Sequence, residues 1–173
     1  VLRDMGGAID RADGIIIGLL DFSAPYALEP SREDLSAILR QSLNLCRHSL
    51  KESTPPVTVA RELAEGLPPI WADRKKLMQV FVNLITNAVQ AMPHGGELRV
   101  RTSLAPDHRV RLEFSDTGIG IPPDQVSDIF NPFFTTKSPG QGTGLGLSVV
   151  HSVVRRYHGD IHVRSTPNVG TTF

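Results

Sequence analysis

Gly140-Gln-Gly-Thr-Gly-Leu-Gly-Leu147 stands near the C-terminal end of the chain and runs into Ser148-Val-Val-His-Ser-Val-Val-Arg155, which has a strong helical pattern. Three of its glycines, Gly142, Gly144 and Gly146, stand at alternate positions and let the backbone come close to a ligand. A helix start offers unpaired N–H groups together with the positive end of the helix dipole. The stretch therefore predicts a phosphate cradle, and an ordinary flexible loop before a helix is the alternative.

A long amphipathic helix is predicted upstream, from Asp73 to Met92. Asp73 is a good N-cap, and Pro93-His-Gly-Gly96 ends the segment. At about 100° per residue, three amide side chains fall within roughly 60° of one another on the flank of the apolar stripe. They could face solvent, or they could offer neutral oxygens to a Mg²⁺ ion that bridges phosphates. The stripe consists of Leu77, Val80, Phe81, Leu84, Ile85, Ala88 and Met92, and the amides are Asn83, Asn87 and Gln90.

An inward-facing carboxylate is predicted at the end of a hairpin whose strands are Glu97 to Leu104 and Arg109 to Asp116. The apolar residues of the second strand alternate toward one face, and Asp116 falls on the same parity. A buried Asp needs hydrogen-bond donors, and an exocyclic amine with its neighbouring ring nitrogen would satisfy it. The alternative is an Asx turn that starts the loop from Thr117 to Gly120.

Aromatic residues and one cation mark the segment between this hairpin and the glycine-rich stretch. After Pro122-Pro123 we expect a short helix that ends at Phe130, followed by a loop from Asn131 to Gly140 that carries Lys137. Such a loop resembles a lid, and the alternative is a surface connector with its phenylalanines tucked inward. Downstream we expect a helix from Leu145 to Tyr157, a strand from Asp160 to Ser165 and a last strand from Gly170 to Phe173.

The chain divides into an N-terminal helix, a linker and one main domain. Apolar residues at alternating three- and four-residue steps predict a helix over residues 1–22. This helix could lie on its own domain, but three heptads without a partner hairpin favour one strand of a bundle that associates between chains. Residues 23–30 are the predicted linker, and residues 31–173 are the main domain.

The main domain is expected to open with a helix, because Ser31 and Asp34 have the spacing of a capping box ahead of an apolar run. The alternating stretch from Val57 to Arg61 predicts a strand. The stretch from Gly66 to Ile70, which contains two prolines, predicts a loop.

Composition excludes some classes of partner. The 173 residues carry 18 basic and 18 acidic side chains, so the zero net charge provides no field that would attract nucleic acid. Cys46 is the only cysteine, which excludes an internal disulfide and a cysteine-built metal site and fits the reducing cytoplasm. The longest apolar run, Ile15 to Leu20, is too short to span a bilayer. Because the chain lacks an initiator Met and stops within a predicted strand, we expect a piece of a longer protein whose other parts include any sensory or membrane segment.

Four motifs, taken together, resemble those of sensor histidine kinases. Asn83-Leu-Ile-Thr-Asn87-Ala resembles the N box, and Asp116-Thr-Gly-Ile-Gly120 resembles the first glycine box. Phe130-Asn-Pro-Phe-Phe-Thr-Thr-Lys137 resembles the F box, most of all that of the nitrogen-regulation sensor kinases, and Gly142-Thr-Gly-Leu-Gly-Leu147 resembles the second glycine box. The resemblance covers nearly the whole chain. It implies the α/β (α+β) Bergerat fold of the GHKL proteins, a two-layer sandwich in which helices cover one face of a mixed sheet, preceded by one helix of a dimerisation hairpin.

The resemblance implies a binding site for the adenine of ATP. Asp116 would bind the adenine amino group, and Gly118 and Gly120 would shape the floor of the adenine pocket. Thr171 would assist at the adenine through water. Residues 1–22 resemble the second helix of the dimerisation and phosphotransfer hairpin.

The resemblance also implies a site for the triphosphate. Asn87 would bind Mg²⁺, with Asn83 supporting the phosphate and metal region beside Gln90. Lys137 would reach the terminal phosphates when the lid closes. Backbone donors of the second glycine box would hold the phosphates, and the residues concerned are Gly142, Thr143, Gly144, Leu145 and Gly146.

The chain departs from the family pattern at two places. Gln90 stands where many relatives have Lys or Arg, which leaves Lys137 as the expected charge stabiliser. None of the six histidines stands in the helical context of the phosphoacceptor motif, so this fragment should bind ATP without phosphorylating itself. These histidines are His48, His94, His108, His151, His158 and His162.

The expected reaction is phosphoryl transfer rather than hydrolysis. In the gyrase, Hsp90 and mismatch-repair ATPases that share this fold, a Glu one helical turn before the metal-binding Asn activates water, and here that position holds Asn83, which cannot take a proton. We expect transfer of the γ-phosphoryl group to a His of the full-length homodimer and onward to an Asp of a response-regulator receiver domain. A related kinase that acts on Ser, and a catalytically silent nucleotide-binding or dimerisation module, are the alternatives.

Overall fold

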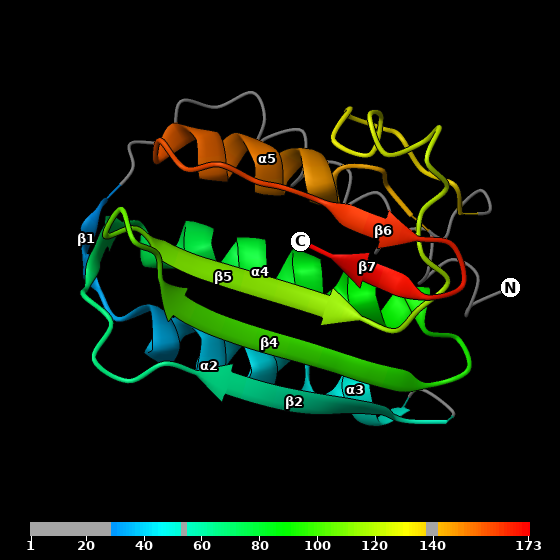
Figure 1. The fold of residues 1–173 in the computed structure, drawn as a ribbon, viewed down its shortest axis with the longest axis horizontal. Coiled ribbons are helices and arrows are strands. Elements are labelled where there is room, and N and C mark those ends of the chain that lie inside the picture. The colour runs from blue at the N-terminus through cyan, green and yellow to red at the C-terminus, as the bar shows by residue number, and fades with distance from the viewer. Residues whose placement is uncertain (1–28, 53–54, 138–141) are drawn as a thin grey trace, which may run out of the picture.

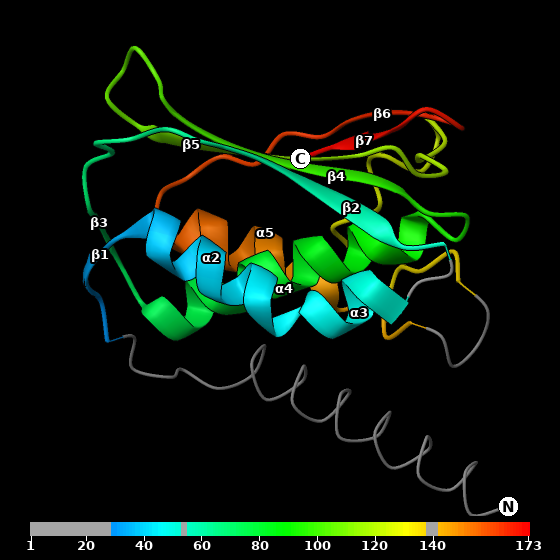
Figure 2. The ribbon, with the colours of Figure 1, turned by 90° about the horizontal axis from the view of Figure 1, so that it is seen from below.

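A mixed sheet covered by helices on one face forms the body of the protein in the computed structural model, which describes residues 29–52, 55–137 and 142–173 (Figure 1, Figure 2). The five strands lie in the order β2-β4-β5-β7-β6. β2 runs parallel to β4, and the other neighbouring pairs are antiparallel. The predicted two-layer α/β sandwich is confirmed. The strands are β2 (Val57–Leu63), β4 (Gly96–Leu104), β5 (Val110–Asp116), β6 (Arg164–Thr166) and β7 (Gly170–Thr172).

The helix layer contains α2 (Leu35–Leu45), the short α3 (Arg47–Glu52), α4 (Arg74–Ala91) and α5 (Gly146–Arg156), all on the same face of the sheet (Figure 2). The predicted helix from Asp73 to Met92 is confirmed as α4 between these two cap residues. The Asp73 carboxylate accepts hydrogen bonds from the backbone N–H groups of Lys75 at 2.8 Å and Lys76 at 3.1 Å. Two of the unpaired donors of the first helical turn are satisfied in this way.

The hydrophobic core lies between the helices and the sheet. Ile38 of α2, Ile85 of α4 and Val100 of β4 are fully buried, and the rings of Phe81 and Phe114 are 5.8 Å apart between α4 and β5. Each buried aliphatic side chain of this kind contributes about 1.5–3 kcal/mol relative to an exposed one. The core fixes α4 against the end of β5, which is where the predicted site residues converge.

The opposite face of the sheet is polar. On β4, Leu98, Val100 and Thr102 point into the core, and the intervening Arg99 and Arg101 point away from it. Both of these arginines form ion pairs with the exposed Glu62 of β2 at 3.6 Å. Such alternation is typical of a sheet with one covered face and one solvated face.

The start of the main domain differs from the prediction. Residues Ser31–Glu33 form β1, which pairs antiparallel with β3 (Ile70–Ala72), and the helix begins only at Leu35. Asp34 is the N-cap, accepting from the backbone of Ala37 at 3.2 Å, so the predicted capping box at Ser31 was wrong. The extended conformation is stabilised by a strand nearly forty residues away, which no local pattern reveals. The helix predicted over residues 1–22, and nearly all of the linker, lie outside the described residues.

Two further predictions were wrong in the C-terminal half. The segment after Pro123 is a series of turns, with backbone bonds such as Gln125 N–H to Pro122 at 3.0 Å, in place of the predicted helix. The strand expected from Asp160 to Ser165 is instead β6 at Arg164–Thr166, because the three-residue β7 offers partners to these residues alone. The predicted helix between Leu145 and Tyr157 is confirmed as α5, and β7 confirms the predicted last strand. Within the described ranges, no helix combines the length and the apolar character needed to cross a membrane.

Candidate functional site

Asp116 ends β5 with its side chain on the helix-facing side of the sheet, and only 9% of the residue is exposed. One carboxylate oxygen accepts the backbone N–H of Gly118 at 2.9 Å, and the backbone N–H of Thr171 also donates to the carboxylate. Burial has the largest effect and raises the pKa of this carboxyl above its ordinary value, although the two N–H donors oppose the shift. The two predicted interpretations are therefore both true, since Asp116 faces inward and also starts an Asx turn.

The loop after Asp116 lies against the C-terminal end of α4 and the turn between β6 and β7. A Cβ atom at Gly118 would overlap the carbonyl oxygen of Ala91, which accepts the backbone N–H of Ile119 at 2.9 Å. Gly120 has a φ of +68°, and a Cβ there would overlap the carbonyl of Thr166. Glycine is required at both positions because the loop runs so close to other backbone. The two predicted glycines thus position the loop beside Asp116.

Two of the three predicted amides of α4, Asn83 and Asn87, face the glycine-rich entry of α5. Asn83 Nδ2 donates to the carbonyl of Gly146 at 3.2 Å. A Cβ atom built on Gly146 would lie 3.7 Å from the side-chain oxygen of Asn83 and 3.8 Å from the amide nitrogen of Asn87. One turn further along α4, Gln90 accepts a hydrogen bond from the ammonium group of Lys137. Asn83 and Asn87 are therefore half-buried beside the helix start, whereas Gln90 is exposed and contacts Lys137.

Lys137 enters the same region from the loop that follows the F-box phenylalanines. Its side chain is half-buried, and burial lowers the pKa of its ammonium group below the ordinary value. Within the described residues, Gln90 is its hydrogen-bond partner and no carboxylate forms an ion pair with it. A cation held by a neutral amide keeps its full charge for an anionic ligand.

The glycine-rich stretch approaches the Lys137 loop closely. Gly144 has a φ of +67°, and its carbonyl accepts the backbone N–H of Phe133 at 2.9 Å, so a Cβ atom at Gly144 would overlap the Phe133 backbone. A Cβ at Gly142 would lie 3.1 Å from the side chains of Lys137 and Thr135. Leu145, the N-cap residue of α5, has no side-chain acceptor for the first N–H groups of the helix. These donors can bind an anion.

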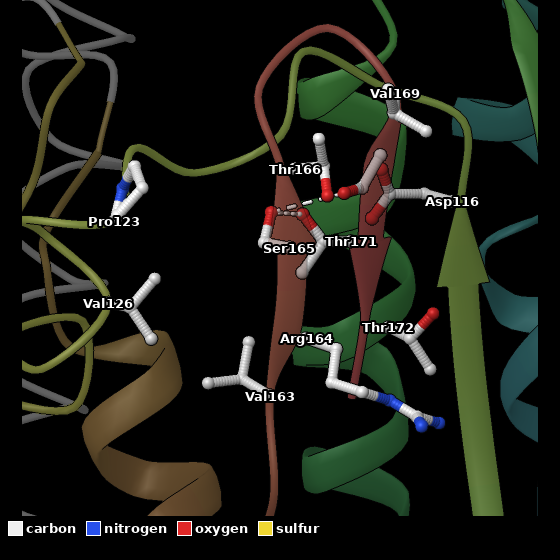
Figure 3. Close-up of a pocket in the computed structure, with 11 residues that line it drawn as sticks. Asp116, Pro123, Val126, Val163, Arg164, Ser165, Thr166, Val169, Thr171 and Thr172 are labelled. Carbon is white, nitrogen blue, oxygen red and sulfur yellow. Dashed lines mark hydrogen bonds between the residues drawn. The ribbon is translucent and has the colours of Figure 1, made fainter.

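A cavity of about 600 Å³ lies beside Asp116, between β6, β7 and the turns after Pro122 (Figure 3). Asp116, Ser165 and Thr171 are three of its polar lining residues, and Val126 and Val163 are two of its apolar ones. The remaining lining residues are Pro123, Arg164, Thr166, Val169, Gly170 and Thr172.

The predicted site residues form two adjoining groups. Asp116 and Thr171 line the cavity, with Gly118 and Gly120 in the adjacent loop. The remaining predicted residues surround the start of α5 and lie outside the cavity lining. Gly118 links the groups, because it packs on Ala91, the neighbour of Gln90. The second group consists of Asn83, Asn87, Gln90, Lys137, Gly142, Thr143, Gly144, Leu145 and Gly146.

Ser165, Val126 and Val163 line the cavity but were not among the predicted site residues. Ser165 and Val163 share the alternation of the predicted strand, which gave the right face but no sign of which strand would lie beside it. Val126 lies in the turns that were expected to form a helix. No motif in the sequence identifies these three positions as part of a cavity.

The fold and the two residue groups define the ATP-binding α/β sandwich class. Residues 72–173 match the model of the family described as "Histidine kinase-, DNA gyrase B-, and HSP90-like ATPase", and the chain belongs to this family. The signal transduction histidine-protein kinase AtoS of Escherichia coli (strain K12) is 37% identical over 165 residues, which are 95% of this chain and 26% of AtoS. The chain thus spans about a quarter of the length of this relative.

Solved structures of histidine kinases have the same fold. Full-length ShkA in complex with AMPPNP has a TM-score of 0.84 and 28% identity, over 99% of this chain and 36% of ShkA. Histidine kinase ThkA in complex with response regulator protein TrrA has a TM-score of 0.78 and 25% identity, over 96% of this chain and 46% of the matched chain. The chain therefore contains the ATP-binding catalytic domain of a sensor histidine kinase. Its place in the nitrogen-regulation subgroup stays a prediction.

Proposed function

We propose that this chain is the phosphoryl-donor part of a sensor histidine kinase, which binds ATP with Mg²⁺ and gives the γ-phosphoryl group to a His on another hairpin helix of the full-length homodimer. The observation that supports this most directly is the bond from Asn83 to Gly146. It brings an amide-lined helix flank and a glycine-rich helix start together. Amide oxygens suit a hard cation, and the helix start suits phosphates, so the two halves of a metal–nucleotide site adjoin.

Asp116 would hold the base of the nucleotide. Its carboxylate has acceptor capacity beyond the two backbone N–H groups that it binds, and it lies at the edge of a cavity with apolar walls. The exocyclic amine of adenine is a donor that such an acceptor would bind. Gly118 and Gly120 of the first glycine box let the loop beside Asp116 pack closely on the backbone of Ala91 and Thr166.

The amides of α4 that lie beside the start of α5 would fit a Mg²⁺ ion. The missing side chain of Gly146 leaves room between the Asn83 and Asn87 amides, and within the described residues no hydrogen bond engages the Asn87 side chain. Asn87 would therefore offer its oxygen to the ion, with Asn83 beside it, and water and phosphate oxygens would complete the coordination. The ion, when bound, would neutralise charge on the phosphates. Lys137 would add a second positive charge at the terminal phosphate.

Transfer to a protein His is favoured over hydrolysis because the position next to the cation site is Asn83. Its amide nitrogen donates to Gly146, and an amide cannot accept the proton of an attacking water. The chain's part in the reaction is therefore to hold the nucleotide and to neutralise its charge, and the acceptor side chain supplies the nucleophile.

The partner proposed for the phosphorylated full-length protein is the receiver domain of a response regulator, as in the complex of ThkA with TrrA. The homodimer would be formed through the hairpin that includes residues 1–22. We place the reaction in the cytoplasm and expect no nucleic-acid partner, because the basic and acidic residues balance.

A transfer experiment in trans tests the proposal. This chain, with Mg²⁺ and γ-labelled ATP, is mixed with a separately expressed dimerisation hairpin that carries the acceptor His of a full-length relative. We expect acid-labile, alkali-stable labelling of the hairpin, as for phosphohistidine. Acid-stable labelling would indicate a Ser kinase, and no Mg²⁺-dependent ATP binding in calorimetry would indicate a silent module. Either result contradicts the proposal.

The Asn87→Ala variant gives the test its specificity. It should lose most of the transfer, because the amide oxygen assigned to the metal is gone. Asn44→Ala is the matched control, since Asn44 is an exposed Asn on α2, far from the cavity lining. Equal activity of Asn87→Ala and the control would remove Asn87 from the metal site.

A further inference from the structure

Asp116, Thr171 and Ser165 form a row across three neighbouring strands. Asp116 of β5 is the register partner of Thr171 of β7, and Thr171 is the register partner of Ser165 of β6. Directly opposed residues in antiparallel strands have their side chains on the same face of the sheet. All three side chains line the cavity, and Figure 3 shows the hydroxyls of Ser165 and Thr171 beside each other.

Ser165 is the most connected member of this row. Its hydroxyl accepts the backbone N–H of Ile121 at 2.7 Å, which ties the loop after β5 to β6. The same hydroxyl lies 3.1 Å from the carbonyl of Gly170 and 2.9 Å from the hydroxyl of Thr171. Ser165 and Thr171 are buried or half-buried, so protein groups provide most of their hydrogen bonds.

The hydrogen count of the two hydroxyls allows two arrangements. Ser165 has one hydrogen, which it can donate either to the carbonyl of Gly170 or to the Thr171 oxygen. In the first arrangement Thr171 donates to Ser165 and presents only lone pairs to the cavity. In the second arrangement the hydrogen of Thr171 is free to point toward a ligand. Ser165 therefore permits Thr171 to act as a donor or as an acceptor, and in the second arrangement the carbonyl of Gly170 gives up the Ser165 hydrogen.

Base recognition needs such a donor, because a carboxylate alone does not distinguish adenine from guanine. The hydrogen-bonding edge of adenine presents an amine donor beside a ring-nitrogen acceptor, and the corresponding edge of guanine presents two donors side by side. Asp116, an acceptor only, suits guanine at least as well as adenine. A hydrogen donor next to Asp116 would pair with the ring nitrogen of adenine and would oppose the N–H of guanine. Thr171 is the next residue along the row.

We propose that Ser165 is a positioning residue for nucleotide selectivity. It fixes the hydroxyl of Thr171 and the loop at Ile121, and it frees the Thr171 hydrogen to meet the adenine ring, directly or through a water. The inference rests on the proposed function, because it requires the base of ATP to occupy the cavity beside Asp116. Ser165 does not itself contact the base, so its effect must appear in selectivity.

The test compares ATP and GTP affinities, measured by calorimetry with Mg²⁺, for the 173-residue chain and its Ser165→Ala variant. We expect the ratio of ATP to GTP affinity to fall by about tenfold in the variant, mainly through weaker ATP binding. Ser115→Ala is the control, because the Ser115 hydroxyl also joins two strands, at 2.9 Å from that of Thr172, but Ser115 is not itself among the residues that line the cavity. The control should keep the wild-type ratio.

Two outcomes would overturn the inference: an unchanged ratio of ATP to GTP affinity in Ser165→Ala, whether or not both affinities fall, or the same change of ratio in Ser115→Ala. If Ser165→Ala fails to fold in thermal scans, Thr171→Val and Ser165→Thr carry the test. Selectivity must then fall in the former and persist in the latter, and any other result refutes the inference. If the wild-type chain binds ATP but the variants show none of these changes in selectivity, only the role of Ser165 is refuted. If the wild-type chain has no affinity for ATP, the proposed function is refuted as well.

Discussion

Asn83 and Gly146 are 63 residues apart in sequence, and the side-chain amide of the first donates to the carbonyl of the second at 3.2 Å. The bond joins α4 to the first residue of α5 and holds the glycine-rich loop against the amide flank. Because the nitrogen of Asn83 is engaged by Gly146, its oxygen is the atom left for a cation. A single hydrogen bond thus connects the assembly of the site with the packing of the helix layer.

Asn83→Ala should lower both stability and nucleotide affinity. Loss of one partly buried hydrogen bond costs about 1 kcal/mol, so the melting temperature should fall by several degrees. Mg²⁺-dependent ATP affinity should fall in addition, because the start of α5 loses its anchor. Differential scanning calorimetry and titration calorimetry measure the two effects, with the exposed Asn44→Ala as control. A stable variant with normal affinity would show that the bond does not organise the site.

Gly144→Ala should destabilise the protein more than Gly66→Ala, although the backbone cost of placing Ala at a positive φ is the same at both positions. Gly144 and Gly66 have φ angles of +67° and +70°, so Ala is disfavoured by about 1 kcal/mol at either position. The space around them differs, because a Cβ at Gly144 would overlap the Phe133 backbone and one at Gly66 meets nothing within 4 Å. Overpacking adds about 1–3 kcal/mol at Gly144 alone. Urea unfolding of both variants measures the difference, and equal destabilisation would contradict the close approach.

The sequence predicts the fold where the pattern is long and local. α4 shows its apolar stripe over five turns and carries its own N-cap at Asp73, so its limits were predicted within a residue. β1 was missed and β6 was misplaced, because each is only three residues long and depends on a partner strand that its own segment does not reveal. The turns after Pro122 contain helix-forming residues, but their backbone makes bonds to residues three positions back and packs beside the cavity. Tertiary context therefore decided these segments.

The site residues divide in the same way, into those that a local pattern predicts and those that depend on the arrangement of the strands. Asp116 was placed correctly by strand parity, and the amides of α4 by helix geometry. Ser165 could not be found in this way, because its significance comes from the order of β5, β7 and β6 in the sheet. A residue that acts through a neighbour on another strand has no signature in its own segment.

Asp116→Asn should abolish ATP binding and yet stabilise the protein at neutral pH. Burial raises the folded-state pKa of Asp116 above its ordinary value of 3.8, so the folded state binds more protons than the unfolded state between the two pKa values. Stability is therefore lost as the pH rises through the folded pKa, and the ionised carboxylate is a cost above it. Thermal scans should show the variant melting above the wild type at neutral pH, with a gap that closes on acidification.

The effect of Asp107→Asn on stability at neutral pH should have the opposite sign to that of Asp116→Asn. The hydrogen bond from Arg109 lowers the pKa of the exposed Asp107, so the contribution of Asp107 to stability is present above the ordinary pKa and is lost as the pH falls.

ATP affinity of the wild type should also decrease on acidification through the raised pKa of Asp116, since a protonated carboxyl loses acceptor capacity. Unchanged ATP affinity in Asp116→Asn would count against the adenine assignment.

Lys137→Met should reduce phosphoryl transfer more than ATP affinity. The ammonium group, held by Gln90 without a carboxylate partner in the described residues, is expected to act on the charge of the transferred phosphoryl group. Removing one such group costs about 10²-fold in rate. Lys51→Met, at an exposed position of α3, is the matched control and should transfer normally. The double variant Lys137→Met with Gln90→Lys returns a cation to the partner position and should recover part of the rate in single-turnover transfer assays. If Lys137→Met transfers as fast as the control, the positive charge at this site has no part in the reaction, and the contact with Gln90 only holds the loop in place.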